Sequence, residues 1–189
     1  FAAHAPRPLA YYAPRHVFYV STLAKCLLPG LRTAYVLTPE GQAQDEVLAA
    51  LRSFVLMSTP LTTALSTQWI HDGTAAMLAE GIRQEAWARQ ALALRTLGEE
   101  GPADSGGIHL WKALPEHWKG QDFVRKAREA GLNVVAQDSF QAGDGEPARS
   151  GAPHIRLSLG RSRSRFELVH ALRRLMELAH RRSLRETVV

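Results

Sequence analysis

Apolar residues follow two different spacings along the chain, and the change between them predicts how it folds. Residues 17–20 and 33–37 are β-branched and aromatic, which is typical of strands. The short connection between them suits an antiparallel pair, with Pro29 and Gly30 at the turn. Apolar positions at helical spacing then predict one helix from about residue 40 to 57 and another from residue 61, separated by Pro60. We therefore expect a buried hairpin followed by helices, after an irregular stretch over residues 1–15.

The longest helical pattern runs from Thr74 to Leu97. Asp72 and Gly73 interrupt the preceding helix, and Gly98 is a suitable C-cap. Beyond it the pattern predicts strands at 106–111, 132–135 and 154–159, and helices at 118–130 and from 164 onward. Loops are expected at 99–105 and 139–153. This order describes a small α+β sandwich with its helices on one face of the sheet.

Composition and charge narrow the class of protein only slightly. The chain has 189 residues, of which 46% are hydrophobic and 22% charged, as in ordinary globular domains. Its net charge of +5 is compatible with nucleic-acid binding, but no DNA-reading motif is visible. A single cysteine, Cys26, excludes an internal disulfide and suggests a reducing, cytoplasmic setting; both a reactive and an inert packed thiol fit its position. No apolar run reaches membrane-spanning length, and residues 1–8 do not resemble a signal peptide.

The connection between the first two strands carries candidate chemistry. Lys25 and Arg32 lie at one end of the predicted hairpin. A partly desolvated lysine amine forms an imine with a carbonyl compound, and an arginine presents a planar fork to phosphate or carboxylate. An aldehyde that carries a phosphate would satisfy both residues, which points to pyridoxal phosphate (PLP). The alternative is a solvated lysine in a loop.

A second candidate is Arg156, which lies in the middle of an apolar strand, where a charge needs a reason. One explanation is an arginine that reaches solvent or a buried acid from the edge of a sheet; the other, a ligand role, is implied by the resemblance described below. His109 and Trp111 share one face of a neighbouring strand, and we expect Trp111 to pack in the core. The histidines lack metal-ligand spacing, so no metal site is predicted, and there is no P-loop, dinucleotide fingerprint or G-x-S-x-G motif.

The stretch from Ser21 to Tyr35, STLAKCLLPGLRTAY, resembles the lysine motif of fold-type-I PLP enzymes, S-x-S-K-x-x-x-P-G-x-R-x-G-Y. It is most similar to the aminotransferase-like domain of MocR-type transcriptional regulators in the GntR superfamily. The resemblance implies that Lys25 holds PLP as a Schiff base and that Arg32 binds its phosphate, with the hydroxyl of Thr22 in place of a phosphate-binding serine. Ala24 replaces a second serine, so one phosphate hydrogen bond is expected to be missing.

The same resemblance implies further roles. The segment around Arg156 matches the R-L-S of the family, whose arginine grips the α-carboxylate of an amino-acid-like ligand. The implied fold class is α/β, as an α+β fragment: residues 1–40 end the large PLP-binding domain, 41–98 are connecting helices, 99–182 form the small α+β domain, and 183–189 are a frayed tail. The intact protein is expected to be a homodimer that contacts DNA only through an N-terminal domain.

One departure from the family affects function. The first acidic residue of this chain is Glu40, so no carboxylate precedes Lys25 to keep the pyridine nitrogen protonated. We therefore expect a C-terminal piece of a larger protein that does not catalyse transamination by itself. Three interpretations follow: part of a regulator that senses an amino-acid-like effector, part of an aminotransferase, or a domain that has kept its core and lost its ligand.

Overall fold

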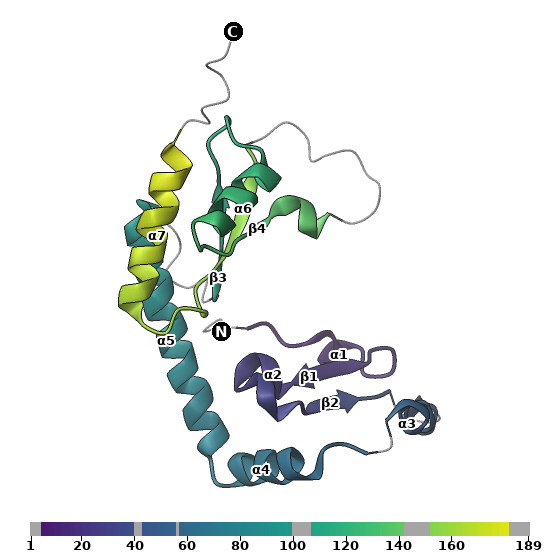
Figure 1. Cartoon of the computed structure of the whole chain (residues 1–189). Coiled ribbons are helices and arrows are strands. Elements are labelled where there is room, and N and C mark those ends of the chain that lie inside the picture. The colour runs from purple at the N-terminus through teal and green to yellow at the C-terminus, as the bar shows by residue number, and fades with distance from the viewer. Residues whose placement is uncertain (1–4, 40–42, 56, 100–106, 142–151, 182–189) are drawn as a thin grey trace. The chain divides into compact units, whose positions relative to one another are not determined.

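A computed structural model describes residues 5–39, 43–55, 57–99, 107–141 and 152–181 (Figure 1). The chain forms two compact units, Phe1–Gln84 and Glu85–Val189, each of which is considered by itself. The predicted tail at 183–189 and most of the predicted loops at 99–105 and 139–153 lie outside the described residues. None of the described helices is both long and apolar enough to cross a membrane.

The predicted hairpin is present in the first unit. Strands β1 (Tyr19–Thr22) and β2 (Ala34–Leu37) pair antiparallel, with Tyr19 opposite Leu37 and Thr22 opposite Ala34. The connection between them contains a short helix, α2 (Leu23–Cys26), and a 3-10 turn, η1 (Pro29–Leu31). Pro29 and Gly30 form a turn as predicted, closed by the hydrogen bond from the N–H of Leu31 to the carbonyl of Leu28 at 3.1 Å, but α2 precedes this turn in a longer connection.

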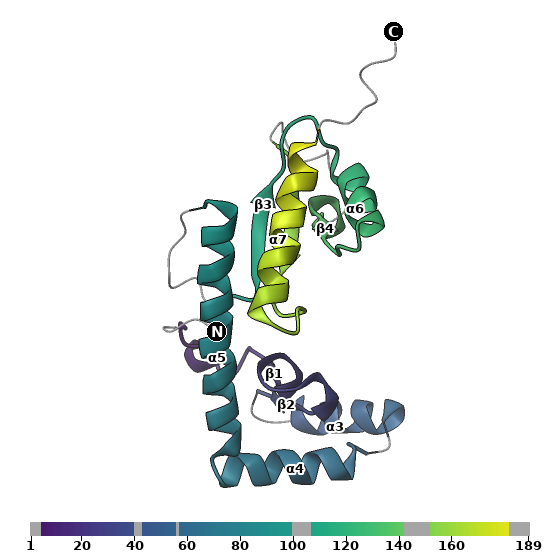
Figure 2. The same ribbon diagram turned by 60° about the vertical axis from the view of Figure 1, so that its left-hand side comes forward.

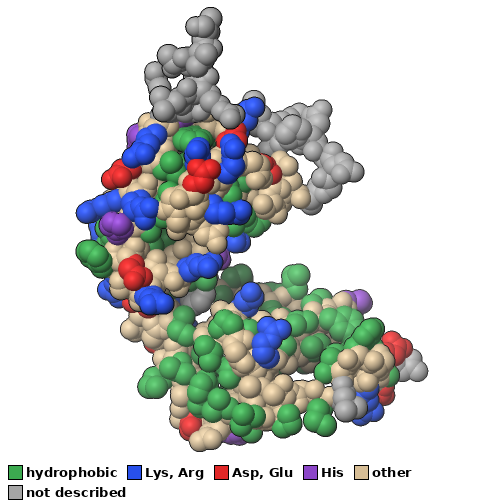
Figure 3. All heavy atoms as spheres, in the orientation of Figure 1, with side chains coloured by type: hydrophobic (Ala, Val, Ile, Leu, Met, Phe, Trp, Pro, Cys, Tyr) green, Lys and Arg blue, Asp and Glu red, His purple; other side chains and the backbone are tan. Residues whose placement is uncertain are grey.

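The predicted burial of this hairpin is also wrong. No residue of β1 or β2 is buried, nor is any residue of helix α3 (Ala43–Phe54). Figure 3 shows hydrophobic side chains across the surface of this unit. They include Tyr19, Val20, Tyr35, Val36, Leu37, Leu48, Leu51, Phe54, Leu61 and Ile70. A two-stranded ribbon cannot cover both of its own faces, so apolar alternation alone did not determine burial.

The helices of the first unit otherwise agree with the apolar pattern. Helix α4 (Pro60–His71) begins one residue before the predicted start at residue 61, and α5 (Thr74–Leu97) has the predicted bounds. Between them Gly73 adopts a φ of +82°, and Asp72 Oδ1 accepts the backbone N–H of Thr74 at 2.9 Å. Figure 2 shows the resulting sharp turn. The irregular start was predicted too broadly, since Leu9–Tyr12 form a short helix, α1, directly after Pro8.

The second unit contains a three-stranded antiparallel sheet in the order β3-β5-β4. The strands are β3 (His109–Ala113), β4 (Val135–Ala136) and β5 (His154–Ser158). One face of the sheet packs against helices α6 (Gly120–Glu129) and α7 (Arg165–His180) and the end of α5. The shared core includes Ala93, Leu97, Phe123, Ala127, Ile155, Leu157, Leu168, Leu172 and Leu175. This arrangement confirms the predicted α+β sandwich.

Two local departures have clear causes. Strand β4 was predicted over 132–135, but the N–H of Leu132 bonds to the carbonyl of Ala127 and Gly131 adopts a φ of +74°, so the chain first completes the helix cap. After β4 a 3-10 turn, η2 (Gln137–Phe140), extends into the start of the predicted loop at 139–153. The expected cap of α7 is present, since Ser164 Oγ accepts the N–H of Glu167 at 3.1 Å.

Glu85 and Arg89 link α5 to the first residue of α7 and to the segment before it. The carboxylate of Glu85 accepts hydrogen bonds from Arg165 Nη2 at 2.6 Å and from Arg89 Nε at 2.7 Å. Arg89 Nη1 also donates to the carbonyl oxygens of Leu159 and Ser162, at 3.0 and 2.8 Å. Hydrogen bonds from Arg165 and then Arg89 lower the pKa of Glu85 from 4.5 to about 2. The carboxylate is thus ionised wherever the chain is folded at ordinary pH.

Replacing Glu85 by glutamine is expected to remove a small, pH-dependent part of the free energy of unfolding. Because folding lowers its pKa, the stabilisation is complete above about pH 4.5 and is lost as the pH falls toward about 2. The side chains of Glu85 and Arg165 are 41% and 56% exposed, so screening keeps the effect at about 1 kcal/mol or less. Urea unfolding of both proteins should differ at about pH 7 and converge on acidification; a gap that persists near pH 2 would contradict this assignment.

Candidate functional site

The predicted PLP-binding lysine lies on the connection between the two strands of the first unit. Lys25 is exposed in the single turn of α2, directly after the end of β1. Among the described residues it forms no ion pair or hydrogen bond, so its amine is accessible and uncommitted. The neighbouring Cys26 is also exposed, and its thiol donates weakly to the carbonyl of Thr22 at 3.5 Å. The predicted reducing setting is compatible with this free thiol.

The hydroxyl of Thr22 is engaged within the chain. It accepts the N–H of Ala24 at 3.2 Å as the N-cap of α2, and it donates to the carbonyl of Thr33 at 3.2 Å. A hydroxyl has one proton, so donating to a phosphate would require breaking the bond to Thr33. In this conformation Thr22 therefore fixes the turn that carries Lys25.

Thr22→Ala is expected to lower the free energy of unfolding by about 1 kcal/mol, because the cap of α2 and the bond to Thr33 are both lost. Thr22→Ser keeps the hydroxyl and should lose much less. Urea unfolding of the two variants beside wild type measures the difference. Equal stability of the alanine and serine variants would show that the hydroxyl does not hold this turn.

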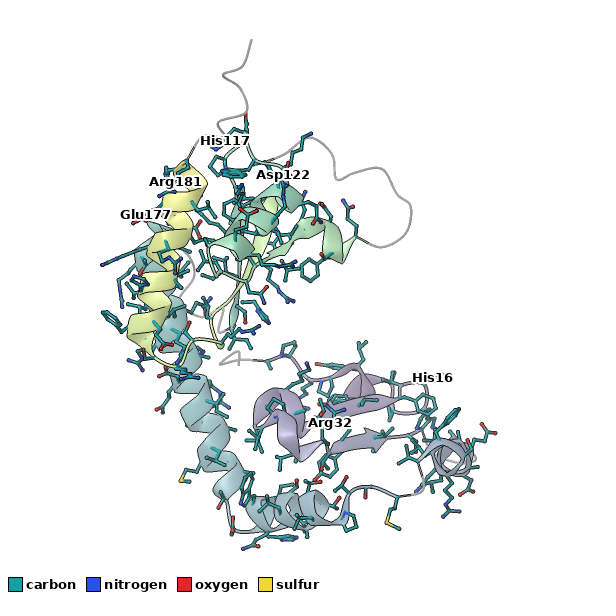
Figure 4. The ribbon with its side chains drawn as sticks, viewed as in Figure 1. His16, Arg32, His117, Asp122, Glu177 and Arg181 are labelled. Carbon is teal, nitrogen blue, oxygen red and sulfur yellow. The ribbon has the colours of Figure 1, made fainter. Side chains whose placement is uncertain are left out.

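Arg32, the predicted phosphate ligand, has an unusual backbone conformation. Its φ of +49° and ψ of 25° place it in the left-handed region, the one such non-glycine residue in the described part of the chain. This conformation costs about 1 kcal/mol for a residue with a side chain. The preceding Leu31 is only 1% exposed and anchors the turn, while Arg32, labelled in Figure 4, is exposed. Strain of this kind persists where the surrounding structure enforces it, often at ligand sites.

The residues present suit a PLP molecule in part. Lys25 offers an exposed amine and Arg32 an exposed guanidinium, and both lie on the same connection between β1 and β2. Neither forms an ion pair within the described residues, so both cationic groups are free for an anionic aldehyde. Thr22 is already committed to the turn. Lys25 thus provides an amine for the aldehyde, and Arg32 provides one cationic group for the phosphate.

Arg156 lies in the second unit, on the face of the sheet opposite the helices. Along β5 the buried Ile155 and Leu157 alternate with Arg156, which is half-buried. Its guanidinium carbon lies 4.9 Å from the centre of the Phe140 ring, in cation–π geometry. Its Nε is buried and has no hydrogen-bond partner among the described residues. An unpaired buried donor costs about 1–3 kcal/mol, a cost that an anionic acceptor would relieve.

The same outer face carries an aromatic cluster that sequence reasoning missed. Trp111 pairs in register with Arg156; its ring stacks on His154 at 5.9 Å and meets Phe140 edge-on at 5.6 Å. Trp111 is 50% exposed, so its predicted place in the core is wrong. Period-two alternation around Arg156 would have found His154, whereas Phe140 lies on η2, within a predicted loop, and carried no signal.

The structure therefore brings the predicted residues together in two groups. Thr22 ends β1, Lys25 and Arg32 lie on the connection that follows it in the first unit, and Arg156 lies in the second unit. His109 shares the outer face of the sheet with Arg156, as the register of β3 and β5 requires.

Known proteins resemble this chain in sequence and in fold. The chain is 31% identical over 173 residues to the uncharacterized HTH-type transcriptional regulator YdeF of Bacillus subtilis; the match covers 89% of this chain and 36% of that protein. The chain thus spans about a third of the length of this relative. No protein-family model matches it.

Solved aminotransferases share its fold. LysN, an α-aminoadipate aminotransferase from Thermus thermophilus, aligns with a TM-score of 0.75 and 25% identity over 90% of this chain and 44% of its own. A kynurenine aminotransferase from Pyrococcus horikoshii aligns with a TM-score of 0.71 and 20% identity, over 93% of this chain and 42% of its own. A multiple substrate aminotransferase from Thermococcus profundus aligns with a TM-score of 0.70 and 21% identity, over 86% of this chain and 40% of its own. These alignments confirm the predicted fold class.

Proposed function

Since this chain has the fold of the carboxyl-terminal part of a fold-type-I aminotransferase-like domain and resembles MocR-type regulators, we propose that it is the cofactor- and effector-binding portion of such a regulator. The observation that carries the proposal is the match to an HTH-type regulator over 89% of the chain, which includes the lysine stretch. A transcriptional role would require the DNA-binding part of the longer protein.

In the proposed function, the two units have separate binding roles. Lys25 would hold PLP covalently and Arg32 would bind its phosphate, while Thr22 holds the turn that positions both. Bound PLP would supply an aldehyde that reacts reversibly with amines. Arg156 would receive the carboxylate of an amino-acid-like effector through its planar fork. The absence of an acidic partner on Arg156 among the described residues supports this role, because its donors are not consumed within the chain.

A second candidate function is an aminotransferase that transfers an amino group between an amino acid and a 2-oxo acid. It is kept as a candidate because the three solved proteins named above, which share the fold of this chain, are aminotransferases. The motif around Lys25 does not separate the two, since the same cofactor chemistry serves either. The regulator is preferred because the sequence relative is named as one.

The experiment that separates them uses the full-length protein. Its binding to the DNA upstream of its own coding sequence is measured by fluorescence anisotropy, with and without a panel of amino acids. Amino-group transfer to 2-oxoglutarate is measured in parallel. We expect specific DNA binding that one amino acid alters, without multiple turnovers, and loss of the amino-acid effect in Lys25→Ala. Sustained turnover without DNA binding would overturn the proposal in favour of the enzyme.

A further inference from the structure

We propose that the outer face of the β3-β5-β4 sheet is a subsite for a monocarboxylate whose neighbouring group is aromatic, and that Trp111 selects that group. The inference rests on the proposed function in one respect, the assignment of Arg156 to a carboxylate. It adds the chemical class of the ligand. The residues that carry it all lie within the second unit.

Arg156 is held in a way that leaves its hydrogen-bonding edge available. A guanidinium can be fixed at its edge by an acid or at its face by an aromatic ring. Here the contact is through the face, with the ring of Phe140 4.9 Å from the guanidinium carbon. The Nε donor is withdrawn from water and unpaired within the described residues. The two terminal Nη groups form no hydrogen bond or ion pair within the described residues, so a carboxylate that approaches them end-on, in the plane of the guanidinium, meets free donors.

Trp111 supplies a flat apolar surface next to that edge. It is the cross-strand partner of Arg156, and neighbours in register lie within about 4.5–5.5 Å at Cβ. Stacking on His154, with 13° between the planes, and the edge contact with Phe140 fix the orientation of the indole. Half of its surface still faces solvent. A rigid aromatic surface exposed beside a free cation suits a ligand that joins a carboxylate to an aromatic ring.

The charge on this face argues against a dicarboxylate. Among the described residues that the register places there, Arg156 is the single arginine or lysine. Lys112, its neighbour along the adjacent strand, alternates to the other face and pairs with Glu99. A second carboxylate would therefore have no arginine or lysine to pair with on this face; the other nitrogen groups there are the imidazoles of His109 and His154, and His154 already stacks on Trp111.

The test is a titration of the purified chain, without cofactor, with phenylacetate, acetate and succinate, followed by the indole N–H signals in two-dimensional NMR. Trp111→Phe assigns the Trp111 signal. We expect phenylacetate to bind about threefold to tenfold more tightly than acetate, which is the range for one aromatic contact, and succinate no more tightly than acetate. Trp111→Leu should remove the preference for phenylacetate and leave acetate binding within about twofold. Arg156→Gln should weaken both ligands, whereas Arg128→Gln, at an exposed position on α6, should weaken neither.

Equal binding of acetate and phenylacetate, or a preference that survives Trp111→Leu, would overturn the inference. Tighter binding of succinate would do the same. Unchanged binding in Arg156→Gln would remove the carboxylate assignment itself. Thermal unfolding of each variant verifies that it folds. Because no PLP is present, failure here leaves the role of Lys25 untouched, and failure of PLP to attach to Lys25 leaves this titration valid.

Discussion

Arg156→Gln is expected to weaken binding of the effector by about a hundredfold in the full-length protein. A bidentate carboxylate accepts two charge-assisted hydrogen bonds from a guanidinium, and each is worth about 1.5–3 kcal/mol, so loss of the pair is expected to cost at least two powers of ten. Glutamine keeps a polar side chain of similar reach but carries no charge. The fold should survive, because Arg156 lies on the face of the sheet opposite the core residues Ile155 and Leu157.

Arg156→Lys provides the graded comparison. It keeps the charge without the planar fork, so an intermediate loss of about tenfold is expected. Effector affinity is measured by the change in DNA binding or in cofactor absorbance on titration, with Arg128→Gln as a matched exposed arginine. Wild-type affinity in Arg156→Gln would exclude this residue from the carboxylate site and favour the alternative of an arginine that only reaches solvent.

Lys25→Ala is expected to abolish covalent retention of PLP in the full-length protein, because no other group on the β1–β2 connection is an amine. The visible absorbance of the purified protein should disappear, while bound PLP that is not covalently held would absorb as the free aldehyde. The DNA-bound state should then stop responding to the effector. Spectra of wild type, Lys25→Ala and Lys119→Ala, which removes an exposed lysine on the second unit, provide the comparison.

Two outcomes would contradict the covalent binding of PLP by Lys25. If Lys25→Ala keeps the absorbance and the effector response of wild type, PLP is held elsewhere or is not used. If Lys119→Ala loses as much absorbance as Lys25→Ala, the signal comes from surface lysines.

The helices and their ends were predictable because the rules that set them are local. The bounds of α5 followed from helical spacing that ends at Gly98, and the start of α4, to within one residue, from Pro60. The cap of α7 followed from Ser164 and Glu167, three residues apart. Helix starts, ends and caps depend on a few residues that are neighbours in the chain, so the sequence alone is enough to predict them.

Burial was not predictable in the same way, since it depends on what lies across a face. Apolar alternation in β1 and β2 predicted a buried hairpin, yet no residue of either strand is buried. Trp111 was assigned to the core from its residue type, although its register with Arg156 puts it on the outer face. Alternation along a strand assigns its residues to two faces but does not say which face is buried. In the second unit the buried face is the one that packs against helices α6 and α7.

The candidate functional residues likewise include features that local sequence predicted and features that it did not. The motif placed Thr22, Lys25 and Arg32 near one another, because they are close in sequence. The left-handed backbone of Arg32 and the engaged hydroxyl of Thr22 needed three-dimensional structure, as did the contact between Arg156 and Phe140, which are 16 residues apart by number. A contact between a strand residue and a residue outside any strand or long helix produces no periodic pattern in the sequence, so it could not be predicted.

The most direct test of the central claim is to reduce the full-length protein with borohydride as purified, digest it and map the phosphopyridoxyl group by mass spectrometry. The account predicts that the group is found on the peptide that contains Lys25, in near-stoichiometric amount, and that Lys25→Ala yields none. Label spread at low levels over several exposed lysines, Lys119 and Lys126 among them, would contradict the claim that this chain holds the cofactor.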